Sequence, residues 1–284
     1  MVPQVGQLRI RGDSEAVVQG YVDQGYRMME IQVISQIMRH WFGPAPAGVV
    51  TPWRGYPDNY VVFDTETSGR DFRLDLILEF GWAIVSNRQV VDTAGVIINW
   101  YGHPAVDWSD LCRRMESCRV AMANKGRTYH FTPERLLAEG VPYDIALPQI
   151  HDILLGAMRG LTIGHNFWSF DRNMLDSLRV RFVDGQRYEW PVNSIFDTGM
   201  AERASQLNRV PWSNDTMASW HERVSKPPYK GVRWALDDWM TPKYNLAKRY
   251  NLNTDMAHTA GADCCTTHAA FDTFRLISEG QYVG

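Results

Sequence analysis

Three short apolar segments follow one another in the first half of the chain. The first begins at Tyr60, the second covers residues 77–85 and the third covers residues 90–99. All are rich in β-branched and aromatic side chains. The four residues 86–89, Ser-Asn-Arg-Gln, have the polar character of a hairpin turn. The pattern therefore predicts three consecutive antiparallel strands.

Helical patterns and short strands alternate after these segments. Thr132, followed by Pro133, has the form of a helix start. The other expected helices cover residues 146–158, 171–182, 234–250 and 259–278, and short buried strands are expected at 161–164 and 194–196. Strands followed by alternating helices and strands predict an α/β fold with a sheet of mixed direction.

A further helical pattern precedes the strands, over about residues 13–42. Its apolar residues recur at three-to-four spacing: Val33, Ile34, Ile37, Met38, Trp41 and Phe42. The Gly-Pro-rich residues 43–48 predict a linker. We therefore expect an N-terminal helical extension and linker over residues 1–48 and a main domain over residues 49–284. Residues 1–42 would tether a partner or form a homodimer, unless their apolar stripe packs on the main domain.

Composition limits the class of protein. Of the 284 residues, 45% are apolar and 21% are charged, as in soluble globular proteins. The net charge of −3 argues against a protein that coats phosphate backbones, since such proteins are usually basic. The four cysteines fit no zinc template and are expected to be reduced thiols. With no signal peptide and no apolar segment of membrane-spanning length, we expect a cytoplasmic protein without membrane contact.

Two acidic residues end the first predicted strand. Side chains alternate between the faces of a strand, so Asp64 and Glu66 project from the same face. Two carboxylates about 4 Å apart repel by about 4 kcal/mol at an effective dielectric constant of about 20, and a divalent cation removes that cost. Oxygen ligands suit Mg²⁺ or Mn²⁺ better than Zn²⁺. A solvated strand end is the alternative interpretation, because a two-residue motif is weak alone.

Two later motifs add further acids and two histidines. Residues 164–171 read GHNFWSFD, in which a buried strand ends at Gly164 and Asp171 opens a helix. Residues 258–263 read HTAGAD, whose small side chains let a helix pack closely on the sheet and leave Asp263 facing the strand of Asp64. Each motif alone also fits a structural role, since acids commonly cap helices and a lone histidine is more often structural.

Together the three motifs are far more specific than any one of them. In this order the sequence resembles the DEDDh group of 3′–5′ exonucleases, the DnaQ-like proofreading family. The matching positions are Asp64, Glu66, His165, Asn166, Phe170, Asp171, His258 and Asp263, with weaker matches at 131–134 and 197–198. The resemblance covers about residues 59–276. It implies a ribonuclease H-like mixed sheet, with three antiparallel strands and then parallel strands, flanked by helices.

The resemblance also implies an activity. Family members hydrolyse phosphodiester bonds at the 3′ end of single-stranded DNA or RNA with two divalent ions, Mg²⁺ or Mn²⁺, and release nucleoside 5′-monophosphates. By this resemblance Asp64 holds both ions, Glu66 and Asp263 complete the first site, Asp171 serves the second, and His258 is the general base. The implied substrate contacts are Thr65, Thr67, Asn166, Phe170 and Trp168. A core position is the favoured alternative for Trp168.

The chain departs from the family pattern in several places. Asn166 and Asp171 are five positions apart rather than the commoner four, and Tyr129 stands where the family has a histidine. The loop 100–129 and the stretch 205–242 are longer than a minimal member needs. Residues 1–58 have no counterpart in the family.

A cluster of basic residues is a candidate substrate groove. Its members are Arg223, Lys226, Lys230, Arg233, Lys243, Lys248 and Arg249, and only two acids, Asp237 and Asp238, lie among them. Tyr229 and Trp234 would add stacking rings for a single strand. A solvated charged face explains the cluster equally well.

Two further functions stay open. One is an exonuclease restricted to RNA ends or very short oligonucleotides, since a single contact can sense a 2′-hydroxyl. The other is a non-catalytic nucleic-acid-binding or assembly module on the same fold, which would be marked by loss of an acid or the histidine. Two divalent ions would offset four carboxylate charges, so the net charge of −3 does not exclude a nucleic-acid substrate.

Overall fold

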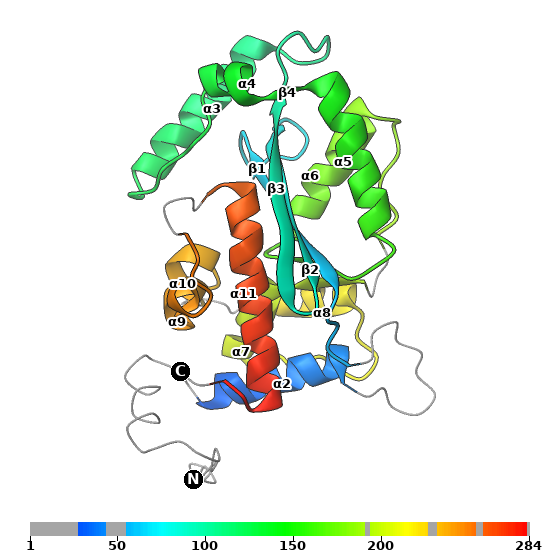
Figure 1. The fold of residues 1–284 in the computed structure, drawn as a ribbon, viewed down its shortest axis with the longest axis vertical. Coiled ribbons are helices and arrows are strands. Elements are labelled where there is room, and N and C mark those ends of the chain that lie inside the picture. Colours follow the sequence, from blue (N-terminus) through cyan, green and yellow to red (C-terminus); the bar gives the residue numbers. More distant parts are fainter. Residues whose placement is uncertain (1–27, 44–54, 191–193, 227–231, 254–257, 283–284) are drawn as a thin grey trace.

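The computed structural model describes residues 28–43, 55–190, 194–226, 232–253 and 258–282. Its centre is a six-stranded sheet with strand order β4-β3-β2-β1-β5-β6 (Figure 1). The strands are β1 (Tyr60–Thr67), β2 (Ile77–Ser86), β3 (Gln89–Asn99), β4 (Val141–Pro142), β5 (Thr162–Gly164) and β6 (Ile195–Asp197). The first three strands pair antiparallel, and β5 and β6 continue the sheet parallel to β1. The predicted fold class is therefore confirmed.

Helices cover both faces of the sheet (Figure 1). One apolar cluster joins one face to α2 (Met28–Phe42), α7 (Thr198–Leu207), α8 (Met217–Val224) and α11 (Ala260–Glu279). The short helices η1 (Leu236–Met240), α9 (Thr241–Lys243) and α10 (Leu246–Arg249) lie along this cluster. A second cluster joins the other face to α3 (Trp108–Ala123), α4 (Pro133–Glu139), α5 (Tyr143–Ala157) and α6 (Asp171–Phe182).

Strand β1 contributes to both clusters because its side chains alternate. Val62 packs into the α11 cluster, and Phe63 packs into the α6 cluster. By the same alternation, Asp64 and Glu66 lie on the α11 face of the strand. The end of β1 is therefore the place where carboxylates of the strand meet the first turn of α11.

The expectation of a loop over residues 100–129 is wrong in its middle part, which forms α3. Asp107 caps this helix by accepting hydrogen bonds from the amides of Ser109 and Asp110. Only Leu111 and Met115 of α3 are buried, so the helix lacks the broad apolar stripe that reveals helices in a sequence. The stretch 205–242 likewise contains α8 and η1.

Helix α2 belongs to the core. The ring of Phe42 lies 5.4 Å from that of Phe271 on α11 and 5.2 Å from that of Phe196 on β6, between ring centroids. The apolar stripe of α2 is thus buried by packing on the rest of the fold. The expected linker after Gly43 and the helical residues before 28 lie outside the described residues.

All four cysteines carry free thiols, as expected. Within the described ranges, no helix combines the length and apolar character that crossing a membrane requires.

Candidate active site

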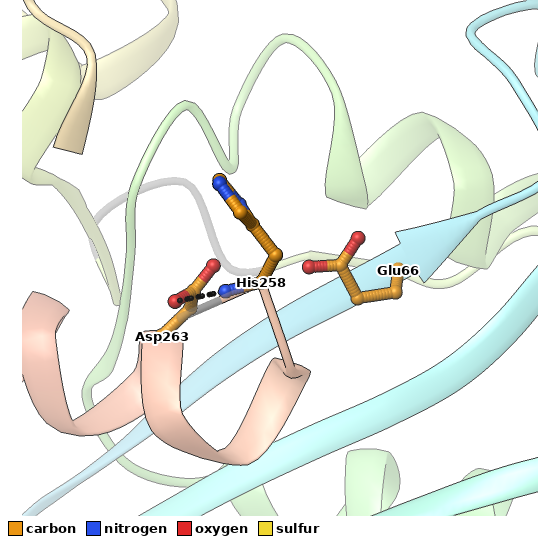
Figure 2. Close-up of side chains that lie close together, drawn as sticks. All are labelled: Glu66, His258 and Asp263. Atoms are coloured by element: carbon orange, nitrogen blue, oxygen red, sulfur yellow. Dashed lines mark hydrogen bonds between the residues drawn. The ribbon is translucent and has the colours of Figure 1, made fainter. Parts of the chain in front are cut away.

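Three of the predicted site residues meet at the end of β1. Glu66, His258 and Asp263 place their ligand atoms within 4.8 Å of one another (Figure 2). Glu66 comes from β1, Asp263 from the first turn of α11, and His258 from the segment just before that helix. Residues almost 200 positions apart in the sequence therefore form one cluster.

Asp171 joins this cluster from the opposite side of the strand. It is the first residue of α6 and is only 2% exposed. Its Oδ1 accepts hydrogen bonds from the amide of Thr65 at 3.0 Å and from the hydroxyl of Thr65 at 2.6 Å. Thr65, a predicted substrate contact, therefore uses both donors to hold Asp171 against β1.

Burial opposes the ionisation of all four carboxyl groups. Burial raises the pKa of Asp64 well above its usual range, and the charges of Asp171, Asp263 and Glu66 raise it further. Burial and the neighbouring acids do the same to the pKa of Glu66. Burial raises the pKa of Asp171 to about 7 and that of Asp263 to about 8.

This donor set fits divalent metal ions. None of the four carboxylates forms an ion pair with a lysine or arginine among the residues the structure describes. Buried carboxylates without a cationic partner are costly, and a divalent ion supplies the missing positive charge. Oxygen donors of this kind suit Mg²⁺ and Mn²⁺.

His258 is held between two carboxylates. Its backbone has a φ of +66°, a left-handed conformation, and its amide donates to Asp263 Oδ1 at 3.3 Å (Figure 2). Its Nδ1 lies 3.4 Å from Oδ2 of Asp237 in η1. Burial lowers the pKa of His258, which favours the neutral ring, and the Asp237 charge opposes that effect.

Asp237 is a site residue that sequence reasoning missed. It lies within the basic cluster 223–249, where the sequence alone shows it only as one of two acids. Its place beside His258 depends on how η1 packs against α11, and no local pattern reports that contact.

The first turn of α11 rests on β2. Thr259 makes no side-chain cap, and Oε2 of Glu79 on β2 accepts the Ala260 amide at 3.0 Å instead. Gly81, two residues further along β2, leaves room for the helix: a Cβ there would lie 2.3 Å from the carbonyl carbon of Ala260. The expected close packing of this helix on the sheet is confirmed.

The second motif forms a tight turn around Asp197. Asn166 has a φ of +60°, and the amides of Asn166 and Trp168 each donate to an Asp197 carboxylate oxygen at 3.0 Å. Asp197 also caps α7. Asn166 thus serves as a turn residue, while Trp168 is half-buried, packs against both cores and stacks on Arg172.

A cleft of about 690 Å³ opens beside the carboxylates. The end of β1 forms one wall, with Thr65, Glu66 and Thr67, and Phe170 and His258 also line it. Residues of α3 and of the turn after it also line the cleft. The cations that line the cleft are Arg70, Arg114, Lys125 and Arg127, and none of them belongs to the predicted basic cluster.

The basic cluster 223–249 does not form one exposed groove. Lys243 is buried, and its ammonium lies 2.7 Å from carboxylate oxygens of both Glu30 and Glu202. Arg223 pairs with Asp215. Neither interpretation of the cluster, substrate groove or solvated face, holds at Lys243, because its charge neutralises acids inside the fold. Tyr229 and Lys230 lie outside the described residues.

No protein-family model matches the chain, and no curated protein matches its sequence. Similar solved structures include E. coli exonuclease I in complex with a dA16 oligonucleotide, at 17% identity and a TM-score of 0.47 over 78% of this chain and 41% of that one. The zinc-bound E. coli exonuclease I–ssDNA complex is similar at 16% identity and a TM-score of 0.46, over 80% of this chain and 40% of that one. A product-bound exonuclease I is similar at 17% identity and a TM-score of 0.49, over 80% of this chain and 45% of that one. The chain thus spans less than half the length of these proteins.

Proposed function

We propose that this chain is a divalent-metal-dependent 3′–5′ exonuclease acting on single-stranded nucleic acid. One observation carries the proposal: Asp64, Glu66, Asp171 and Asp263 converge with His258 where β1 ends. The motifs that supply these five residues also occur in the order of the DEDDh family they resemble. The direction of hydrolysis and the release of nucleoside 5′-monophosphates are what that resemblance implies.

Two ions, Mg²⁺ or Mn²⁺, would be held by these carboxylates. By the family resemblance, Asp64 would serve both ions, Glu66 and Asp263 the first, and Asp171 the second. When bound, such ions stabilise the charge on the attacking and leaving oxygens of a phosphodiester. The raised pKa values of the four acids support this assignment, because the ionised site calls for a counter-charge.

His258 would take the proton of the attacking water. A general base must be unprotonated at the working pH, and burial lowers the pKa of His258. Its Nδ1 faces Asp237, so Nε2 is the nitrogen that accepts the proton. The hydrogen bond from its amide to Asp263 keeps the imidazole beside the acids.

The remaining predicted contacts divide into two groups. Thr67 and Phe170 line the cleft and would contact the terminal nucleotide. Thr65, Asn166 and Trp168 would act indirectly, since Thr65 holds Asp171 and the other two shape the turn that leads to α6.

The direct test is cleavage of 5′-labelled single-stranded DNA, single-stranded RNA and a recessed duplex, each with Mg²⁺, Mn²⁺ or EDTA. A ladder that shortens from the 3′ end and disappears with EDTA is expected. Comparing DNA with RNA decides between a general exonuclease and an exoribonuclease. A circular single-stranded DNA should resist cleavage, because it has no 3′ end.

Asp171→Asn provides the matched inactive variant, because the amide oxygen of asparagine still accepts from Thr65. Asp152→Asn, at an exposed position of α5, is the control with the same chemical change. Cleavage of the circle, cleavage in EDTA, or full activity of Asp171→Asn would overturn the proposal. Binding of DNA without hydrolysis under every metal condition would indicate a binding module instead.

A further inference from the structure

Helix α3 lines the cleft beside the carboxylates, and it is not part of the site itself. We infer that one face of α3, with the turn that follows it and Arg70, binds the phosphate backbone of the strand that leads to the scissile bond. The inference rests on the proposed function and names its substrate class: an extended oligonucleotide, selected by contacts upstream of the terminal nucleotide.

The cleft-lining residues of α3 form one stripe. They are Arg114, Ser117, Cys118, Ala121 and Met122, followed by Lys125 in the turn that continues the helix. Their separations of three, one, three, one and three positions are those of a single helical face. Ser117, Cys118 and Ala121 in the middle of the stripe are small, Met122 is longer, and the residues at both ends are cationic. A strand can therefore lie close against the middle of the helix with phosphates near its ends.

The cations of the cleft differ in their availability. Arg114 is paired with Asp110 and Asp75, and Arg127 is paired with Asp238. Arg70 and Lys125 are exposed, and within the described ranges neither has a hydrogen bond or an ion pair with a carboxylate. These two side chains are free to pair with phosphates.

The same cleft joins this stripe to the proposed site of hydrolysis, because Thr65, Glu66 and His258 also line it. The cleft volume of about 690 Å³ lies within the roughly 300–1,000 Å³ of pockets that enclose drug-sized ligands. With its terminal nucleotide beside Thr65, Glu66 and His258, a strand would therefore have the chain behind it within reach of α3.

The test compares Arg70→Ser/Lys125→Ser with wild type. The control is Arg119→Ser, an exposed arginine of α3 that pairs with Glu116 and does not line the cleft. Rates are measured on single-stranded oligonucleotides of two to twelve nucleotides and on a minimal substrate, thymidine 5′-(p-nitrophenyl phosphate). Binding of a labelled ten-nucleotide strand is measured in EDTA at several salt concentrations.

For wild type and Arg119→Ser, we expect KM to fall as the substrate lengthens. In the double variant, the ratio of kcat/KM on the ten-nucleotide strand to kcat/KM on the minimal substrate should fall at least tenfold, mainly through KM. The slope of log affinity against log salt should decrease by about 1.4, since each phosphate contact on a single strand contributes about 0.7.

An unchanged length dependence and salt slope in the double variant, with an active wild type, would overturn the inference and leave the proposed function intact. Absence of hydrolysis by wild type on every substrate would instead overturn the proposed function. In that case the salt-dependent binding in EDTA still decides the inference.

Discussion

Glu79 on β2 accepts a hydrogen bond from the amide of Ala260, the first residue of α11, at 3.0 Å. Glu79 is buried and lies directly opposite Glu66 in the β1–β2 register. Strand β2 thus carries Glu79, which caps α11 next to His258 and Asp263. The neighbouring strand β1 carries Glu66, the carboxylate that meets these two residues. This hydrogen bond, together with the packing of Ala260 against Gly81, fixes the start of α11 relative to the sheet.

Glu79→Ala should lower kcat at least tenfold with a smaller change in KM, because His258 and Asp263 lose the contact that fixes them. The lost cap should also cost about 1 kcal/mol of stability. Glu79→Gln keeps an oxygen that accepts from Ala260 and should recover most of kcat. Steady-state kinetics and thermal denaturation of both variants measure this. Equal kcat in Glu79→Ala and wild type would contradict the positioning role.

Asp64→Asn should abolish metal-dependent cleavage and leave the fold intact. Burial and four neighbouring acids oppose the ionised form of Asp64, so removal of its charge relieves repulsion in the metal-free protein. Cleavage assays in Mg²⁺ and thermal denaturation in EDTA test both parts. The melting temperature should match or exceed that of wild type. Substantial Mg²⁺-dependent cleavage by this variant would refute the metal-site assignment.

The metal-free protein should lose stability as the pH rises from about 4 to about 8. The pKa values of Asp171 and Asp263, about 7 and about 8, lie above the values near 3.9 of unfolded chains. The folded state therefore holds more protons than the unfolded state between these limits, so the contribution of these groups is full below about pH 4 and is lost as they ionise.

In EDTA, the melting temperature at pH 8.5 should lie several degrees below that at pH 5.5, since about 1 kcal/mol corresponds to about 2–4 °C in a chain of this size. Mn²⁺ or Mg²⁺ should restore it at pH 8.5. Scanning fluorimetry of wild type and Asp171→Asn, which should show a smaller pH effect, provides the measurement. A melting temperature that rises with pH in EDTA would be incompatible with the buried acids.

Asp237→Asn should shift the acid limb of the pH–rate profile to lower pH. The negative charge of Asp237 raises the pKa of His258, so its removal lets burial lower that pKa further. Because the neutral ring is the active form, the rate then persists to more acidic pH, while its maximum falls about tenfold as the ring loses its partner. Profiles of kcat/KM from pH 5 to 8 give the shift. The control is Asp152→Asn, at an exposed position of α5, which should leave the limb in place.

The sequence predicts the elements whose pattern is local. The expected helix 171–182 agrees with α6, and the three antiparallel strands agree within two residues at most ends. Periodic apolar residues produce both elements, and each contributes many side chains to a core. Helix α3 escaped detection because it buries only Leu111 and Met115 and presents its other faces to solvent and the cleft.

Long-range contacts account for the rest of what the sequence did not reveal. Three motifs were enough to nominate five residues, and the structure brings those residues to one place. The sequence assigns no site role to Asp237 or Glu79, and it places Lys243 in a surface cluster. Burial and pairing decide what a charged side chain does, and neither can be read from a local pattern. Lys243 has the composition of a surface residue and the environment of a core residue.

The pairing of Lys243 with Glu30 has a consequence for biosynthesis. Glu30 and Lys243 are 213 positions apart. Phe42, which lies on α2 like Glu30, packs on Phe271 of α11. During translation α2 leaves the ribosome long before α11 is synthesised. The apolar face of α2 therefore stays unpacked until nearly the whole chain has been made. Contacts of such separation slow folding. We therefore expect ribosome-bound chains that end before α11 to expose this face and to bind chaperones that recognise apolar segments.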